Sequence, residues 1–248
     1  MKKVLLILFI SFLSVLFLSG SQSIAQPQPT AQVDNNAGTA SLPPYNGPKA
    51  RIAVSDFDVK AAKAGGEIGT GLREMLVTAL MNSSRFRVVE RQALSAVMQE
   101  QELAASGAAQ AGGGAKRGQI KTADLMITAA VTEFEPNAKG GAAGLGGGGR
   151  VGGGILGAVL GGSVNKAHMA LDIRIIDTSS SEILAATRVQ GQATDMKGGI
   201  LGGFLGDWGL GAGLSGYANT PMEKAIRVCI IEAVKYIAQQ VPYDYYKY

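Results

Sequence analysis

The stretch HMALDIRIID, residues 168–177, alternates apolar and polar side chains and decides the fold class. Its apolar positions would share one face of a β-strand: Met169, Leu171, Ile173 and Ile175. Asp172 and Arg174 would lie on the other face, because successive side chains of a strand point to opposite sides. Residues 178–181 are polar and turn the chain, and residues 182–192 return as a second strand. The pattern therefore predicts an antiparallel hairpin with one buried face.

Strand and helix patterns alternate on the N-terminal side of this hairpin. Strands are expected over Arg51–Phe57, Phe86–Val89 and Ala123–Phe134. Helices are expected over Glu67–Met81 and Glu90–Leu103, the second with Leu94, Val97 and Met98 directed into the core. This order of elements predicts an α/β fold in which helices flank a mixed sheet.

The last predicted helix has the strongest start signal in the chain. Thr220 is placed to cap it, Pro221 takes the first helical position, and Glu223 completes a capping box. One apolar stripe follows at helical spacing: Met222, Ile226, Cys229, Ile230, Ala233 and Ile237. Pro242 closes the element, and Cys229 is expected to pack in the core.

The N-terminal residues predict export. Lys2 and Lys3 precede the apolar run 4–18, and Ala25 ends a small-residue motif, so residues 1–25 are typical of a signal peptide. The alternative is a membrane anchor, but a spanning helix needs about 20 apolar residues. Removal of residues 1–25 lowers Lys plus Arg from 23 to 21 against 19 acids, so the positive excess falls from +4 to +2. Residues 26–49 are expected to be a flexible linker, residues 50–242 one domain, and residues 243–248 a tail.

The composition argues against an enzyme. Cys229 is the only cysteine, so neither an intrachain disulfide nor a Cys-x-x-Cys motif is possible. His168 is the only histidine, and a solvated or packed strand residue is its expected role. We find no catalytic set of acid, base and nucleophile, and we expect no metal and no cofactor. The small positive excess after export is weak evidence for nucleic-acid binding, which needs a basic stripe on the folded domain.

Two glycine-rich inserts, residues 139–166 and 194–219, interrupt the domain and carry many large apolar side chains. Exposing such side chains to water is unusual, so a membrane or a partner surface is expected. Residues 208–217 of the second insert alternate apolar residues with Gly or Ser over the length of a transmembrane strand, about 9–11 residues. The candidates to face the membrane are Trp208, Leu210, Ala212, Leu214 and Tyr217, with the two aromatic residues at the bilayer interfaces.

The first insert permits more than one interpretation. Gly153, Gly157 and Gly161 recur every four residues, which is a helix-packing pattern, although residues 151–162 are too short to span a bilayer as a helix. A phosphate-binding loop would need a GxxxxGK[ST] frame, and neither insert has one. For both inserts, membrane hairpins, segments of an oligomer interface and disorder remain alternatives.

Several short stretches carry a resemblance to one family. They are MLVTAL at 75–80, Arg85-Phe86, ERQAL at 90–94, ADLM at 123–126 with Phe134, LDIRIID at 171–177, and Glu182-Ile183-Leu184. On these residues the chain, from Arg51 to Val241, resembles the curli production assembly and transport channel family. The two inserts fall where that family has its two membrane hairpins.

The resemblance implies a ring of identical exported subunits, each giving two hairpins to a shared outer-membrane β-barrel above a periplasmic vestibule. Such a ring would let unfolded curli-like amyloid subunits leave by passive diffusion, with accessory envelope proteins as further partners. The alternative from another functional class is a soluble periplasmic binding module of similar fold, such as an activator of cell-wall synthesis.

Two departures from the family pattern matter. Members commonly carry a lipidated cysteine just after the signal peptide, and this sequence has none there. Members also narrow the pore with aromatic and amide side chains in the loop before the first helix. The equivalent positions here are Val59, Lys60, Lys63 and Ala64. A ring of lysines would favour acidic cargo, whereas the alternative is an ordinary solvated loop.

Overall fold

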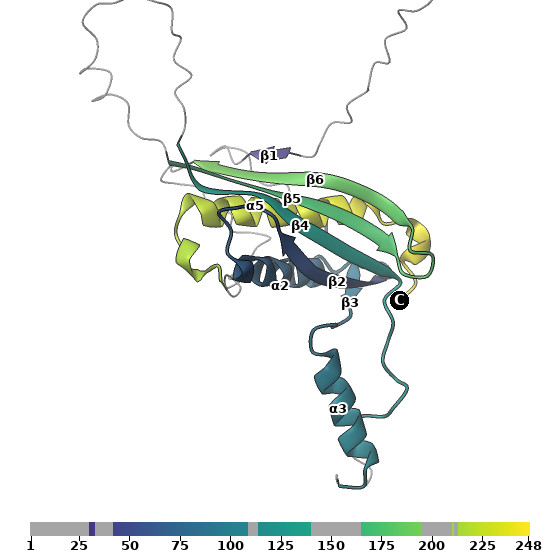
Figure 1. Ribbon diagram of the computed structural model, residues 1–248. Coiled ribbons are helices and arrows are strands. Elements are labelled where there is room, and N and C mark those ends of the chain that lie inside the picture. Colours follow the sequence, from purple (N-terminus) through teal and green to yellow (C-terminus); the bar gives the residue numbers. More distant parts are fainter. Residues whose placement is uncertain (1–29, 33–41, 109–113, 140–164, 195–209, 211–212) are drawn as a thin grey trace, which may run out of the picture.

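The computed structural model of the chain describes residues 30–32, 42–108, 114–139, 165–194, 210 and 213–248 (Figure 1). The predicted signal peptide and most of both glycine-rich inserts lie outside these residues.

A mixed β-sheet forms the centre of the domain (Figure 1). Its strands are β1 Thr30–Gln32, β2 Ala50–Val59, β3 Phe86–Val88, β4 Leu125–Lys139, β5 Asn165–Asp177 and β6 Ile183–Thr194. The order across the sheet is β1-β6-β5-β4-β2-β3. The neighbours β4, β5 and β6 pair antiparallel, whereas β2 lies parallel to both β4 and β3. The predicted α/β fold with a mixed sheet is confirmed, and so is the hairpin β5–β6.

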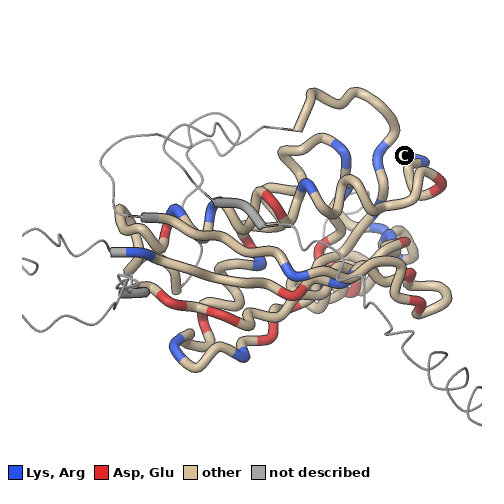
Figure 2. Tube along the Cα trace, turned by 90° about the horizontal axis from the view of Figure 1, so that it is seen from above, with Lys and Arg blue, Asp and Glu red and all other residues tan. Residues whose placement is uncertain are grey.

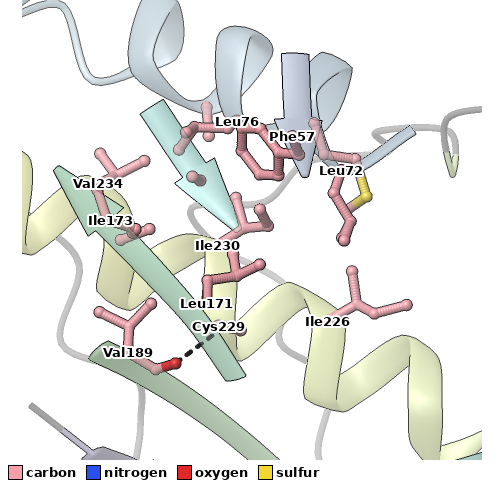
Figure 3. Packing of buried hydrophobic residues seen from close by; sticks show 14 of the residues in the cluster. Phe57, Leu72, Leu76, Leu171, Ile173, Val189, Ile226, Cys229, Ile230 and Val234 are labelled. Carbon is pink, nitrogen blue, oxygen red and sulfur yellow. Dashed lines mark hydrogen bonds between the residues drawn. The ribbon is translucent and has the colours of Figure 1, made fainter. Parts of the chain in front are cut away.

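Two helices, α2 Gly66–Asn82 and α5 Pro221–Gln240, cover one face of the sheet (Figure 1). The alternating apolar side chains of β5 all point to this face and are fully buried. Figure 3 shows Leu171 and Ile173 of β5 against Ile230 and Val234 of α5. This face therefore holds the hydrophobic core, as the period-two pattern predicts.

The start of α5 follows its predicted chemistry. The Thr220 hydroxyl accepts a hydrogen bond from the backbone N–H of Glu223 at 3.4 Å. The Glu223 carboxylate in turn accepts one from the backbone N–H of Asn219 at 2.6 Å, one residue earlier than in a standard capping box. Cys229 is fully buried, and its thiol donates to the Val189 carbonyl oxygen at 3.7 Å (Figure 3).

The prediction for the second helix is wrong in both its start and its orientation. α3 runs over Leu94–Ala105, and it projects beyond the edge strand β3, away from the sheet (Figure 1). Val97 and Met98 are 42% and 54% exposed, so they do not enter the core. The helix begins four residues late because the Glu90 carboxylate binds the backbone N–H groups of the next three residues.

Described parts of the expected linker and the tail pack on the domain, which the sequence did not reveal. Thr30–Gln32 of the expected linker adds a strand to β6, and the Arg85 guanidinium donates to the Pro43 carbonyl at 3.1 Å. In the tail, Tyr248 exchanges two backbone hydrogen bonds with Lys49. The short 3₁₀ helix η2, residues 243–245, precedes that contact. Parts of the segment expected to be a linker, and the tail, thus belong to the folded unit.

The tight contact between β6 and α5 gives a prediction of stability. A Cβ atom added at Gly191 would lie 2.0 Å from the Ala225 carbonyl oxygen and 2.9 Å from the Cys229 Cβ. We expect Gly191→Ala to lower the free energy of unfolding by about 1–3 kcal/mol, because neither backbone can move freely. Urea denaturation followed by circular dichroism measures this. Gly216→Ala, where a Cβ meets nothing within 4 Å, is the control. Equal midpoints for the two variants would contradict the prediction.

Candidate functional site

Both inserts leave the domain at the same end of the sheet, which we call the insert pole. The last residue of β4, Lys139, pairs with the first residue of β5, Asn165, and Lys166 pairs with Thr194 at the end of β6. The first insert therefore joins β4 to β5, and the second follows β6 beside them. Because β2 is parallel to β4, the chain after Val59 also starts at this pole.

The four pore-loop candidates come together at the insert pole, in the segment between β2 and α2. Val59 and Ala64 are half-buried against the core, so they are not free loop residues. The backbone N–H of Lys60 donates to the Val131 carbonyl of β4 at 2.9 Å, while its side chain is exposed. The Lys63 ammonium forms an exposed ion pair with Glu135 of β4. The loop is thus tied to β4, and one of its two lysines is already paired.

The predicted membrane strand over residues 208–217 is wrong at its C-terminal end. Residues 215–217 form the 3₁₀ helix η1, and Gly213 before it has φ +76°, which breaks an extended chain. Leu214 is fully buried in the core and Leu210 packs against it. Tyr217 packs edge-on against Phe134 at 5.3 Å between ring centroids. These three side chains face the domain, while Trp208 and Ala212 lie outside the described residues.

The face of the sheet opposite α2 and α5 carries charged side chains, and we call it the open face. Figure 2 shows acidic and basic residues interleaved along the strands. Arg188 of β6 binds Asp172 of β5 at 2.7 Å and Glu133 of β4 at 3.3 Å. His168 lies 3.1 Å from Glu133, so these side chains form a ladder across three strands. The hydrogen bond to Asp172 raises the pKa of Arg188 further, which keeps the ladder charged.

A second polar network holds the base of the projecting helix α3. Arg73 of α2 is almost fully buried and donates to the side-chain oxygen of Gln92, whose amide donates to Asp56 of β2 at 2.7 Å. The Arg73 Nε lies 3.6 Å from Asp56. Backbone N–H groups, chiefly that of Gln92, hold the pKa of the Glu90 carboxyl below its ordinary value. The network joins α2, β2 and the start of α3, and so fixes where the helix leaves the domain.

A cavity of about 740 Å³ lies at the opposite end from the inserts. The Tyr245 hydroxyl donates to Asp177 beside this cavity, which raises the pKa of Tyr245 to about 12. Hydrogen bonds from Ser179 and Tyr245 hold the pKa of Asp177 far below its ordinary range. The described residues contain no group of three or more His, Cys, Asp or Glu side chains placed to bind a metal ion. None of the helices in the described part of the chain is both long and apolar enough to cross a bilayer.

Comparison with known proteins extends the resemblance seen in the short stretches. The family model described as "Curli production assembly/transport component CsgG" matches residues 36–245. The chain belongs to this family. It is also similar to a protein of Neisseria meningitidis serogroup B that is named as a lipoprotein, with 28% identity over 207 residues. That match covers 79% of this chain and 78% of the relative.

Three solved structures align with the chain at TM-scores below 0.5. Hypothetical protein CT253 from Chlamydia trachomatis has a TM-score of 0.45 at 12% identity and covers 78% of this chain and 98% of its own. Lipoprotein GNA1162 from Neisseria meningitidis has a TM-score of 0.33 at 14% identity, covering 59% and 84%. The PelC dodecamer from Paraburkholderia phytofirmans has a TM-score of 0.35 at 12% identity, covering 80% and 96%.

The network at the base of α3 predicts a pH-dependent contribution to stability. We expect Glu90→Ala to lower the free energy of unfolding at pH 7 by about 0.5–1 kcal/mol, a small effect because the carboxylate is exposed. Since the folded chain lowers this pKa from 4.5, the contribution is complete above that pH and disappears as the pH falls through the lowered value. Urea denaturation of both proteins at pH 7 and pH 3 measures the difference. A difference as large at pH 3 as at pH 7 would contradict the prediction.

Proposed function

We propose that the chain is a subunit of a ring-shaped secretion channel associated with the outer membrane. In this proposal, the ring lets unfolded amyloid-type protein subunits diffuse out of the periplasm. The proposal includes no enzymatic step and no cofactor. Its main support is that both inserts and the lysine-bearing loop start from one pole of a domain whose family is named for curli assembly and transport.

The strand pairing at the insert pole suits a hairpin. β4 and β5 are antiparallel neighbours that still pair at Lys139 and Asn165, so a hairpin could continue the same ladder without a change of topology. The second insert starts beside it, one strand further along the sheet. Two hairpins from adjacent strands would present their apolar residues together, which is the arrangement a membrane ring needs, because lipid tolerates no unpaired strand edges.

The charges at the insert pole bear on the cargo. Lys63 is compensated by Glu135, whereas the exposed side chain of Lys60 shares a surface hollow with Asp56 and Asp58. If acidic side chains compensate both lysines at the entrance of the pore, that entrance would favour acidic cargo less than the sequence alone predicts. We therefore propose a nearly neutral mouth that admits unfolded chains of either net charge.

The proposed location follows from the N-terminal sequence and the relatives. An apolar signal-like segment begins the chain, and a relative and a similar structure are named as lipoproteins. This sequence has no cysteine near residue 25 to carry a lipid. We propose that the hairpins, rather than a lipid, hold the ring in the outer membrane.

Replacing the inserts tests the channel directly. We expect the full chain to stay with outer membranes after a high-salt wash and to conduct ions in planar lipid bilayers. A variant with residues 142–162 and 196–208 replaced by Gly-Ser linkers of equal length should wash off and not conduct, because its apolar side chains are gone. Unchanged circular dichroism would show that the domain still folds. Membrane retention and conductance that survive the replacement would overturn the proposal.

Charge changes at the mouth test the role of the loop. We expect Lys60→Glu to shift the reversal potential in a salt gradient toward cation preference, because its side chain is exposed. Lys63→Ala should shift it in the same direction, because it leaves the Glu135 carboxylate uncompensated, whereas Glu135→Gln should shift it toward anions. If all three variants keep the ion selectivity of the unmodified chain, this loop does not line the conduction path.

A second candidate function is a soluble periplasmic binding module. It is favoured by the packing of Leu214 and Tyr217 on the domain, and by the cavity at the far end from the inserts. The same fractionation separates the candidates, because a binding module would be released by salt from the unmodified chain and would run as a small species without conductance.

A further inference from the structure

Helix α3 exposes large apolar side chains among the residues that the structure describes. The helix has 12 residues and lacks a side-chain hydrogen bond at its N-cap. An isolated helix of this length is marginally stable in water, so most of its stability must come from packing. Val97 and Leu103 are 42% and 48% exposed, and Glu100 lies between them at a spacing of three residues. We call Val97, Glu100 and Leu103 the outer stripe.

The returning chain contacts α3 on two sides. Arg117 pairs with Glu102 at 3.6 Å on the side opposite Glu100, and a Cβ at Gly114 would touch Ala104, one turn after Glu100. Gln101, the buried residue of the helix, follows Val97 by four residues. The three side chains of the outer stripe stay exposed beside these contacts, and the Arg73 network fixes the base of the helix.

A matching apolar surface lies on the open face of the sheet. Met126 of β4 pairs with Ile176 of β5, which pairs with Ile183 of β6. Met126 and Ile176 are half-buried, and Ile183 is 51% exposed. We call these three side chains the apolar row. It is unusual on this face, where the neighbouring rows toward the insert pole carry charged side chains such as Asp172, Arg174 and Arg188.

The outer stripe lies beyond one edge of the sheet, whereas the apolar row crosses the open face from β4 to β6. α3 leaves beyond β3, the last strand at one edge, and the apolar row ends on β6 toward the other (Figure 1). The helix of one chain therefore points away from its own apolar row. If identical copies stand side by side in the same orientation, the helix of each copy reaches the β6 side of the next. Such a head-to-tail contact is the type that closes rings.

Charge supports the same pairing. α3 carries Glu100 and Glu102 and no basic residue, and Glu102 is already paired with Arg117. Among the described residues, neither Glu100 nor Arg174 belongs to an ion pair within 4.0 Å. Arg174 is exposed and lies two residues from Ile176 on the same face of β5. An acid at the centre of the outer stripe thus matches a base beside the apolar row.

We propose that α3 of each copy docks its outer stripe on the apolar row of the neighbouring copy, with Glu100 facing Arg174. The inference rests on the proposed ring and names the surfaces through which the ring assembles. The partner is a second copy of this chain, and the contact combines a small apolar patch with one ion pair at its centre.

Charge exchange between the two residues tests the contact. We expect Glu100→Arg and Arg174→Glu each to raise the concentration at which the ring dissociates by about tenfold, because each places like charges together. The double variant, Glu100→Arg with Arg174→Glu, should restore assembly. The mass of the detergent-extracted particle, measured by light scattering, gives the readout. Glu67→Arg, an exposed position in the first turn of α2 near the insert pole, is the matched single-charge control and should assemble normally.

Disulfide cross-linking gives a second readout that does not depend on a change of stability. Leu103→Cys combined with Ile183→Cys should link neighbouring copies into a ladder of covalent oligomers under mild oxidation. Leu103→Cys combined with Met81→Cys, an equally exposed position on α2, should not. The native Cys229 is fully buried and does not contribute.

The outcomes separate this inference from the proposed function. If the unmodified chain forms a ring that both single charge variants keep, and the Leu103–Ile183 pair does not cross-link, the docking inference is overturned and the ring survives. If the unmodified chain is a monomer in detergent, the ring itself is overturned and the docking inference falls with it.

Discussion

The fold depends on the burial of one face of the mixed sheet against α2 and α5. Alternation along β5 places Leu171 and Ile173 on that face, and the Gly191 backbone approaches α5 so closely that a methyl group has no room. Because side chains alternate along each strand, burying one face of the sheet in the core places every second residue on the other face. The charged ladder of Glu133, Asp172 and Arg188 is therefore a consequence of the same constraint that builds the core.

This division gives the domain two distinct ends and two distinct edges. Each of the long strands β4, β5 and β6 has one end at the insert pole, while the cavity and the docked tail lie at the other end of the sheet. Across the sheet, α3 leaves at the edge of β3, and Thr30–Gln32 covers the edge of β6. In the proposed ring, the inserts at one pole would meet the membrane while the helical arm at one side meets a neighbouring copy.

Local patterns with strong periodicity predicted the structure well. The hairpin from 168 to 192 and the capped start of α5 are confirmed, because period-two alternation and a Thr-Pro-x-Glu start each fit one local geometry. Periodicity fails where tertiary contacts decide. Val97 follows Leu94 at helical spacing, which predicts a buried side chain. The sequence has no signal that this helix projects away from the domain. The sequence pattern places Leu214 in a membrane strand. In the structure the chain turns at Gly213, and the Leu214 side chain is buried in the core. The docking of the Tyr-rich tail depends on Lys49 and Arg51, about 200 residues earlier, and no local signal connects them.

The paired backbones of Lys49 and Tyr248 bring the entry and the exit of the domain into contact. A protein whose ends meet in this way can in principle be joined there and reopened elsewhere without breaking its layers, as in circular permutation. The natural places to reopen it lie at the insert pole, where β4, β5 and β6 have one end each. A chain cut at that pole and joined between Lys49 and Tyr248 would keep the strand pairs from β2 to β6.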